Sequence, residues 1–480
     1  MAKNATNPWV VLVLICVAQF MVVLDATIVN VALPSIRDDL GFNETSLAWV
    51  INAYTLTFGG LLLLGGRLGD LYGPRRLFLF GIGLFTVASL VCGLSTSQGM
   101  LIGARAVQGI GGAVASAVSL SLMLGLFTEP AERAKAMGLF GFVASGGGSI
   151  GVVLGGVLTD AINWHWIFLV NLPIGVAVVF LTLRLIPDAQ GSAAQGRSLD
   201  IGGAITVTGA LMVAVYAIVN GNADGWTTGT TLVRFGIAVA LFVAFIVLET
   251  RVKSPLMPLG LFRKRNLSTA SVAGILWAGA MFAWFFLSAL YMQLVLGYSP
   301  LKVGLGFLPG NLVMGILSIA VSAKLVMRYG VRIPLAVGLV AAGLGLLLFA
   351  RAPVHGGYVV DVLPGMILLG FGAGIAFNPV LFAAMSEVKP EESGLASGIV
   401  NTSFMMGGAL GLAVLASIAA SRTAHLDPGA GDHPTAAALT SGYHLAFVVG
   451  ALFAFGAAAI GAALLRTNVA PAHEPEPAPA

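Results

Sequence analysis

Long apolar segments recur along the whole chain, and they restrict its fold more than any other feature. Each is close to the roughly 20 residues that an α-helix needs to cross the apolar core of a bilayer. Short polar stretches separate the segments. The pattern predicts an all-α integral membrane protein with fourteen transmembrane helices, at residues 9–33, 46–65, 77–96, 99–127, 135–159, 164–184, 200–220, 232–249, 268–294, 302–323, 333–351, 360–385, 393–420 and 443–465.

The composition also favours a membrane protein. Hydrophobic residues make up 58% of the 480 residues and charged residues only 9%, whereas about 25% of the residues of a soluble domain are charged. This balance excludes a soluble enzyme and a nucleic-acid-binding protein. We expect the two cysteines, Cys16 and Cys92, to be buried thiols rather than a disulfide. No phosphate loop of the Gly-x-x-x-x-Gly-Lys-Ser/Thr type is present, which disfavours an ATP-driven pump, and no cofactor is implied.

The distribution of Lys and Arg predicts the orientation. If the N-terminus is cytoplasmic, 18 of these residues fall on the cytoplasmic side, five on the outer side and one, Arg105, inside the membrane. Cytoplasmic loops of membrane proteins carry an excess of Lys and Arg. We therefore expect a multi-pass protein of the cytoplasmic membrane with both termini in the cytoplasm.

An internal repeat relates the two halves of the chain. A shift of 257 residues matches Leu68 with Leu325, Tyr72 with Tyr329, Gly73 with Gly330, Arg75 with Arg332 and Gly151 with Gly408. Parallel repeats are typical of transporters whose halves rock about a site at their interface. The predicted organisation is an N-terminal six-helix bundle at 1–186, a cytoplasmic linker at 187–199, two inserted helices with a cytoplasmic loop at 200–265, a C-terminal six-helix bundle at 266–466 and a disordered cytoplasmic tail at 467–480.

The repeat does not extend to the charged residues inside the predicted membrane segments. The same shift places Phe282 where the first half has Asp25, and Val362 where it has Arg105. A charge inside a bilayer costs on the order of 2.5–3.5 kcal/mol by insertion scales, so such residues are rare and usually functional. The difference suggests ion coupling in the N-terminal half and an apolar substrate wall in the C-terminal half.

Five motifs occur in order on the predicted helices. They are Leu24–Pro34 on the first helix, Gly66–Arg76 after the second, Arg105–Gly112 on the fourth, Gly147, Gly151, Gly155 and Gly156 on the fifth, and Trp164–Phe168 with Asn171–Gly175 on the sixth. Together they resemble the motifs of the major facilitator superfamily, specifically its fourteen-helix drug:proton antiporters, over about the whole chain. One departure is Val152, which stands where the fifth-helix motif usually has proline.

Asp25 and Arg105 are the candidate proton-coupling residues. Each lies about seven or eight residues from the outer end of its predicted helix, and therefore roughly 10–12 Å below the outer surface. Opposite charges at one depth stabilise each other, and the carboxylate could exchange a proton as the cavity alternates between sides. The resemblance implies this coupling role, and a static ion pair between two helices is the alternative. We expect Gln108 and Asn30 to support the pair, although Gln108 could instead serve packing.

The resemblance also implies a conformational latch at the cytoplasmic ends of the helices. In it the Asp70 carboxylate contacts a helix N-terminus or a cation in one state and leaves it in the other. The candidate partners are Arg75, Arg76 and Arg133, for which a purely topological role is the alternative.

Small residues form one face of the fifth predicted helix. Gly147, Gly151 and Gly155 recur at four-residue spacing, with Gly156 beside them. Such faces permit close contact between helices in lipid. We expect this face to lie along the interface between the bundles, where a tight seam would block leakage.

Aromatic, methionine and asparagine side chains suggest the substrate cavity. Aromatic and methionine side chains suit an adaptable pocket for flat, apolar or cationic compounds, although most of them must face lipid or neighbouring helices. The candidates are Tyr54, Trp277, Met281, Trp284, Phe285, Phe377, Asn378, Asn401 and Phe404. In the last outer loop, His425, Asp427, Asp432 and His433 are interpreted as a solvated loop rather than a metal site.

These observations predict a monomeric, proton-coupled antiporter that exports hydrophobic or cationic small molecules by alternating access. One alternative is a dedicated exporter of a single metabolite, antibiotic, lipid or siderophore. A non-transporting membrane receptor or scaffold is a second alternative, against which the charges of Asp25 and Arg105 inside the membrane argue.

Overall fold

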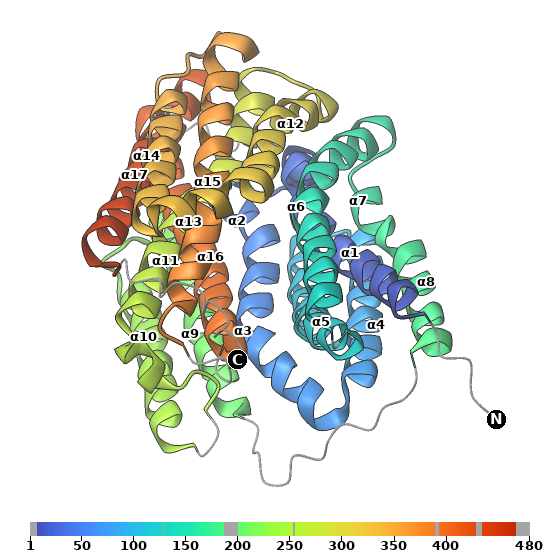
Figure 1. Ribbon diagram of the computed structural model, residues 1–480. Coiled ribbons are helices and arrows are strands. Elements are labelled where there is room, and N and C mark those ends of the chain that lie inside the picture. Colours follow the sequence, from blue (N-terminus) through green and yellow to red (C-terminus); the bar gives the residue numbers. More distant parts are fainter. Residues whose placement is uncertain are drawn as a thin grey trace, which may run out of the picture.

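A computed structural model of the chain describes residues 7–127, 129–186, 200–252, 255–388, 393–428 and 434–466. Every regular element in these ranges is a helix (Figure 1). The predicted linker at 187–199 and the predicted tail at 467–480 lie outside the described residues.

The helices follow one another along the chain as three groups. The first group is α1 (Pro8–Leu40), α2 (Glu44–Leu47), α3 (Trp49–Tyr72), α4 (Pro74–Gly93), α5 (Gln98–Leu126), α6 (Pro130–Ala161), α7 (Trp166–Leu169) and α8 (Asn171–Leu185). The second is α9 (Ile201–Asp224) and α10 (Gly229–Arg251). The third is η1 (Leu259–Arg263), α11 (Arg265–Leu290), η2 (Tyr291–Val295), α12 (Pro300–Leu317), η3 (Ser318–Ser322), α13 (Ala323–Tyr329), α14 (Arg332–Phe349), η4 (Tyr358–Val362), α15 (Leu363–Met385), α16 (Ser393–Leu426) and α17 (Ala436–Leu464).

Thirteen helical stretches among the described residues are long and apolar enough to cross a membrane. The fifth predicted segment falls on α6, which has 32 residues and an apolar part at Ile150–Ala161. The thirteen stretches and α6 occupy the places of the predicted segments in order. The predicted all-α membrane fold is confirmed.

α1 is longer than its apolar segment. We predicted an end near Leu33, but the helix continues through Pro34 to Leu40 and ends at Gly41, where φ is 68°. A proline inside a helix removes one backbone donor. Here the surrounding residues of α1, including Leu33 and Ile36, are buried against neighbouring helices, and this packing offsets the lost bond.

The turns at two repeat-related positions both use a glycine with positive φ. α3 ends at Gly73, where φ is 92°, and α13 ends at Gly330, where φ is 71°. Residues with a Cβ rarely adopt a positive φ, so glycine allows an immediate turn into the next helix. In the first half Pro74 then begins α4, because its fixed φ suits the first helical position.

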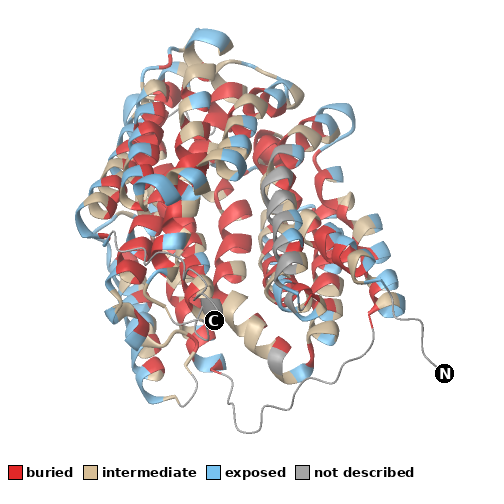
Figure 2. Cartoon of the chain, in the orientation of Figure 1, coloured by how far each residue is buried: buried red, intermediate tan, exposed pale blue. Residues whose placement is uncertain are grey.

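Two bundles stand side by side (Figure 1). In the first, α1 packs on α6, and both α3 and α4 pack on α5. In the second, α11 packs on α16, and α14 packs on α15 and α17. Buried residues concentrate along these contacts, whereas exposed ones line the outer faces of the bundles (Figure 2).

The bundles meet along two helix pairs, α6 with α12 and α3 with α16. The inserted helix α9 contacts both α3 and α16, so the pair α9–α10 is attached at a seam between the bundles. The predicted insertion of this pair between two six-helix bundles remains a prediction.

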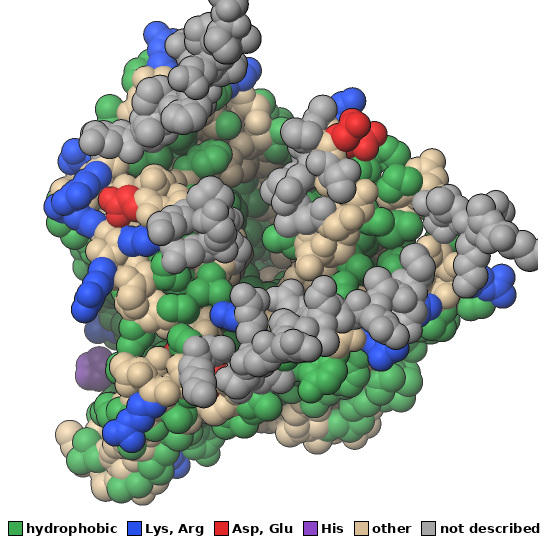
Figure 3. All heavy atoms as spheres, turned by 60° about the horizontal axis from the view of Figure 1, so that its bottom comes forward, with side chains coloured by type: hydrophobic (Ala, Val, Ile, Leu, Met, Phe, Trp, Pro, Cys, Tyr) green, Lys and Arg blue, Asp and Glu red, His purple; other side chains and the backbone are tan. Residues whose placement is uncertain are grey.

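The molecule is closed at the end away from its termini. A Cβ added at Gly156 of α6 would lie 2.7 Å from the Pro300 carbonyl oxygen, and one at Gly304 of α12 would lie 2.7 Å from that of Val152. Gln293 of η2 also donates to the Val31 carbonyl oxygen of α1 at 2.8 Å. The opposite face, which carries the termini, is hollowed near its centre and has Lys and Arg side chains around its rim (Figure 3).

Candidate functional site

The carboxylate of Asp25 is completely buried at the middle of α1, with 0% of the residue exposed. Its Oδ2 accepts a hydrogen bond from Arg105 Nη1 at 2.5 Å. Its Oδ1 accepts from Gln108 Nε2 at 2.8 Å and from Asn171 Nδ2 at 2.9 Å. Three donors from α5 and α8 therefore hold one carboxylate away from water, as a buried charge requires.

Arg105 reaches Asp25 from α5 and is itself 1% exposed. Its Nε donates to the Val50 carbonyl oxygen at 3.0 Å, and its Nη1 also donates to Gln108 Oε1 at 2.6 Å. The guanidinium carbon lies 4.3 Å from the centre of the Tyr54 ring, a distance typical of a cation–π contact. α3 thus supplies a carbonyl and a ring to the cation, while α1 supplies the anion.

Two residues that the sequence analysis did not select complete this network. Ser89 of α4 accepts hydrogen bonds from Gln108 at 3.1 Å and Asn171 at 3.0 Å, and it donates to the Phe168 carbonyl oxygen at 2.9 Å. Ser89 and Asn171 are both 0% exposed. Ser89 offered only a polar side chain inside an apolar segment, which many membrane helices also show for packing reasons. Asn171 begins the second part of the sixth-helix motif, but no role was assigned to it.

The network joins α1, α3, α4, α5, α7 and α8 around one ion pair. We predicted that Asp25 and Arg105 lie at the same depth and that Gln108 supports the pair or serves packing. The three side chains are in contact. Asn30 is placed differently: its amide donates to the Thr27 carbonyl oxygen at 3.1 Å, within α1. Tyr54, which we assigned to the substrate cavity, is 5% exposed and covers Arg105 instead.

The glycine face of α6 lies against α1 rather than along the interface between the bundles. A Cβ added at Gly147 would meet Val23 at 3.2 Å, and one at Gly155 would lie 2.5 Å from the Ile28 carbonyl oxygen. Gly151 faces Leu24 and Thr27 in the same way. Gly156 points the other way, onto α12. The three-glycine face therefore fixes the helix that carries Asp25, and the closure between bundles uses Gly156.

The side chains of Asp70 and Arg133 lie outside the described part of the structure. Arg75 donates through Nη2 to the Leu183 carbonyl oxygen at 3.1 Å, which ties the start of α4 to the end of α8. Arg76 is exposed at the same end of the molecule. In the last loop, Asp427 accepts from the Thr435 amide at 2.8 Å, while Asp432 and His433 are outside the described residues.

The aromatic candidates form two separate groups. Phe404 of α16 lies edge-on to Phe282 of α11, with ring centres 6.1 Å apart, and to Phe377 of α15, 5.9 Å apart. Phe377 is 46% exposed, and Asn401, one turn before Phe404, is also exposed. These three rings, hereafter the phenylalanine trio, join three helices of the second bundle and have an accessible edge.

The other aromatic candidates are more enclosed. Trp284, Phe285 and Phe307 stack between α11 and α12, with the Phe285 and Phe307 ring centres 5.4 Å apart. Trp277 and Trp284 are at most 1% exposed, and Met281 is partly buried. Asn378 donates to the Ser318 carbonyl oxygen at 2.8 Å. Of the nine cavity candidates, Phe377 and Asn401 are therefore the exposed ones.

The sequence pattern of the Major Facilitator Superfamily matches residues 15–412, which run from α1 into α16 and include the ion pair. The chain belongs to this superfamily. Among curated relatives, the puromycin resistance protein pur8 of Streptomyces alboniger is 39% identical over 92% of this chain and 89% of its own length. The cephamycin export protein CmcT of Amycolatopsis lactamdurans is 39% identical with the same coverage. The multidrug resistance protein Stp of Mycobacterium tuberculosis is 37% identical over 85% of this chain and 75% of its own length.

Solved structures share the fold of this major facilitator. An auto-inhibited peptide transporter of the POT family superimposes with a TM-score of 0.64 at 16% identity, covering 93% of this chain and 96% of the other. The nucleoside transporter NupG gives a TM-score of 0.62 at 13% identity, covering 96% of this chain and 100% of the other. At these identities the likeness concerns the arrangement of helices alone.

Proposed function

We propose that this major facilitator is a proton-coupled antiporter that exports hydrophobic or cationic small molecules by alternating access. The observation that carries the proposal is the fully buried network of Asp25, Arg105 and Gln108 in the first bundle. The relatives named for puromycin resistance, cephamycin export and multidrug resistance support an efflux role.

Asp25 is the proton carrier in this proposal. When a proton binds the carboxylate, the negative charge is lost and the bond from Arg105 weakens, because charge-assisted hydrogen bonds are the stronger kind. Arg105 keeps its contacts with the Val50 carbonyl oxygen and the Tyr54 ring. α1 is then free to shift relative to α3 and α5. One elementary charge crossing 100 mV is worth about 2.3 kcal/mol, enough to drive a useful gradient of substrate.

The substrate meets the second bundle in this scheme. The phenylalanine trio offers ring faces and edges for flat apolar or cationic compounds. Asn401 adds a polar group near the trio. The glycine contacts of α6 with α1 and α12 transmit movement between the bundles, because backbones in such close contact must move together.

We also propose the cytoplasmic membrane as location, with both termini in the cytoplasm. The basic rim of the face that carries the termini supports this orientation (Figure 3). It makes the hollow face cytoplasmic and the closed end external. The domain boundaries at 186, 199, 265 and 466, the Asp70 latch with Arg75, Arg76 and Arg133, and a monomeric state with no nucleic-acid partner belong to the same proposal.

Efflux from proteoliposomes tests the coupling. We expect Asp25→Asn to abolish dye transport driven by a pH gradient. Membrane insertion and folding should stay largely intact, because Arg105 keeps the Val50 carbonyl oxygen, Gln108 and the Tyr54 ring as partners. The matched control is Asp224→Asn, because Asp224 also pairs with an arginine, Arg234, but is exposed at the end of α9. Normal gradient-driven efflux by Asp25→Asn would refute the proposal.

A dedicated exporter is the second candidate function, since CmcT is named for the export of one antibiotic class. A panel of a cationic dye, puromycin, a cephamycin and a neutral aromatic compound separates the two. A multidrug exporter transports several of them, whereas a dedicated exporter transports one chemical class.

A further inference from the structure

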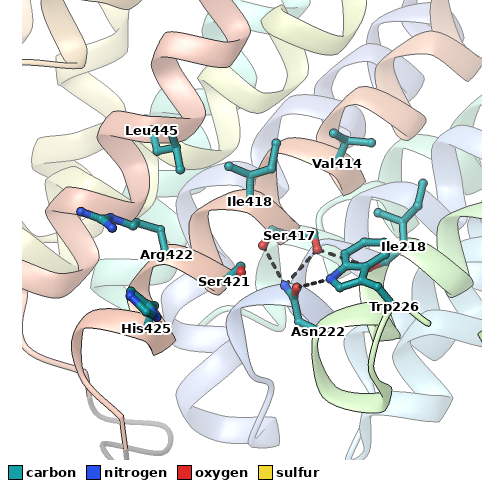
Figure 4. Close-up of a pocket in the computed structure, with 10 residues that line it drawn as sticks. All are labelled: Ile218, Asn222, Trp226, Val414, Ser417, Ile418, Ser421, Arg422, His425 and Leu445. Carbon is teal, nitrogen blue, oxygen red and sulfur yellow. Dashed lines mark hydrogen bonds between the residues drawn. The ribbon is translucent and has the colours of Figure 1, made fainter. Parts of the chain in front are cut away.

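We infer that a groove between the inserted helices and the second bundle binds an anionic phospholipid of the outer leaflet. The groove has a volume of about 600 Å³ and lies between α9, α16 and α17 (Figure 4). None of the residues that line it belongs to the ion-pair network or to the phenylalanine trio. The assignment to the outer leaflet rests on the proposed orientation.

The position of the groove matches the level of lipid head groups. α9 ends at Asp224, α16 ends at Leu426 and α17 begins at Ala436, so all three have these ends on the closed side of the molecule. Arg422 lies four residues before the end of α16, roughly 6 Å along its axis. Apolar side chains then continue the groove toward the middle of the membrane.

The mouth of the groove is cationic. Arg422 and His425 are exposed on one face of α16, one turn apart, and both line the groove. Arg422 Nε donates to Ser441 Oγ at 3.3 Å. Among the described residues no carboxylate forms an ion pair with Arg422, whereas Arg234 of the neighbouring hairpin is paired with Asp224. The terminal guanidinium nitrogens of Arg422 are thus available for a phosphate.

The walls of the groove are mostly apolar, and the polar side chains of Asn222, Ser417 and Trp226 bond to one another. Asn222 of α9 donates to the Ser417 carbonyl oxygen at 2.8 Å and to Ser417 Oγ at 3.0 Å. Trp226 donates to Asn222 Oδ1 at 3.0 Å. What remains for a ligand is a hydrocarbon surface that includes Ile418 and Leu445.

These features together indicate which kind of lipid fits the groove. A groove that opens to the bilayer at this depth presents a cation at head-group level and hydrocarbon below it, which is the layout of a glycerophospholipid. A net positive mouth favours an anionic head group over a zwitterionic one, because each Lys or Arg near the surface contributes about 1 kcal/mol toward anionic lipid. The lipid would lie at the seam where α9 meets α16, beside the contact of α9 with α3.

Native mass spectrometry of the full chain tests the inference. Purified protein is incubated with equal amounts of phosphatidylglycerol and phosphatidylcholine of the same acyl composition, and retained lipids are counted. We expect preferential retention of phosphatidylglycerol, and Arg422→Gln should lower that preference about fivefold, the equivalent of about 1 kcal/mol. Arg422→Lys should keep most of it, because the charge remains. Arg351→Gln is the matched control, since Arg351 is an exposed arginine before η4, outside the lining of the groove.

A second variant probes the hydrocarbon part. Ile418→Trp fills the groove and should remove one bound lipid of either kind, and Leu445→Trp offers the same test from α17 if the first variant does not fold. Equal retention of the two lipids by the unmodified protein would overturn the inference. So would an Arg422→Gln variant that matches Arg351→Gln, or groove-filling variants that fold and retain as many lipids as the parent.

Discussion

The two bundles place opposite chemistry on related positions of one scaffold. Asp25 of α1 is surrounded by hydrogen-bond donors from α5 and α8. Its counterpart Phe282 on α11 has the Phe404 ring edge-on to it. The counterpart of Arg105, Val362, is buried in η4 and carries no charge. A fold of this kind tolerates a buried charge only where neighbouring helices supply its partners.

The glycines extend the comparison. Gly151 of α6 packs on α1, and its counterpart Gly408 of α16 packs on α11. The corresponding helix pair therefore has a glycine at its contact in each bundle. One turn earlier the bundles differ, because the position of Gly147 is taken by Phe404 in the second bundle. The first bundle uses that space for close contact with α1, and the second fills it with an aromatic ring. We infer that one bundle is built to hold an ion pair and the other to present rings.

Among the variants that test this difference between the bundles, loss of Arg105 should have the largest effect on stability and transport. Arg105→Gln leaves Asp25 buried without a cation, and breaking a buried pair in this way destabilises a protein by about 3–5 kcal/mol. We expect a large fall in the thermal unfolding midpoint in detergent and no gradient-driven efflux. The double variant Asp25→Asn with Arg105→Gln should recover much of the stability but not the transport. A double variant as unstable as the single one would show that the network is not organised around this pair.

Adding a methyl group at the glycine contact between α6 and α1 should have the next largest effect on stability. In Gly151→Ala the added Cβ would lie 2.9 Å from the Leu24 carbonyl oxygen, an immovable backbone atom. We expect a loss of about 1–3 kcal/mol, the range for overpacked cores. Gly408→Ala should cost less, because its new neighbour is the partly exposed Phe282 ring, which can shift. Both are measured as unfolding midpoints, with Gly148→Ala as control, since its nearest contact would be 3.7 Å away. Equal losses of stability in Gly151→Ala and Gly408→Ala would contradict this difference between the two bundles.

Removing Asn171 tests the outer part of the network. Asn171→Ala deletes one hydrogen bond to Asp25 and one to Ser89. A typical buried hydrogen bond contributes about 0.5–1.5 kcal/mol, so we expect a small loss of stability and an efflux rate reduced severalfold. Asn220→Ala serves as control, because the Asn220 amide donates within α9, to the Tyr216 carbonyl oxygen at 2.9 Å. Identical efflux by the two variants would remove Asn171 from the coupling network.

The smallest effect on stability is expected in the phenylalanine trio. Phe377 is 46% exposed, so Phe377→Ala should leave the unfolding midpoint almost unchanged. It should raise the KM for flat aromatic substrates a few fold while gradient dependence stays intact. Phe382→Ala is the control, because Phe382 is 48% exposed on the same helix but outside the trio. A variant that changes proton coupling rather than substrate preference would contradict the division between the bundles.

The sequence predicted the central pair but not its surroundings. Asp25 and Arg105 stood out because a charge in an apolar segment is costly, and equal depth then suggested their contact. Ser89 carries no charge, so nothing distinguished it from polar residues that serve packing. Asn171 stood in the sixth-helix motif, but without a charge it gave no sign that it contacts Asp25. The prediction that the glycine face of α6 lies along the interface between the bundles was wrong for a related reason. Spacing shows that a helix has a small-residue face, but not which of several neighbouring helices it meets.

The membrane fold was determined by the sequence itself. Apolar segments of this length must form helices in lipid, because every backbone polar group there needs a partner within the segment. The choice of partners was decided only by the tertiary structure. Asp25 bonds to residues 80 and 146 positions away in the chain, and the Tyr54 ring covers Arg105. Such contacts depend on the rotation and tilt of each helix, which are set by packing against its neighbours rather than by its own hydropathy.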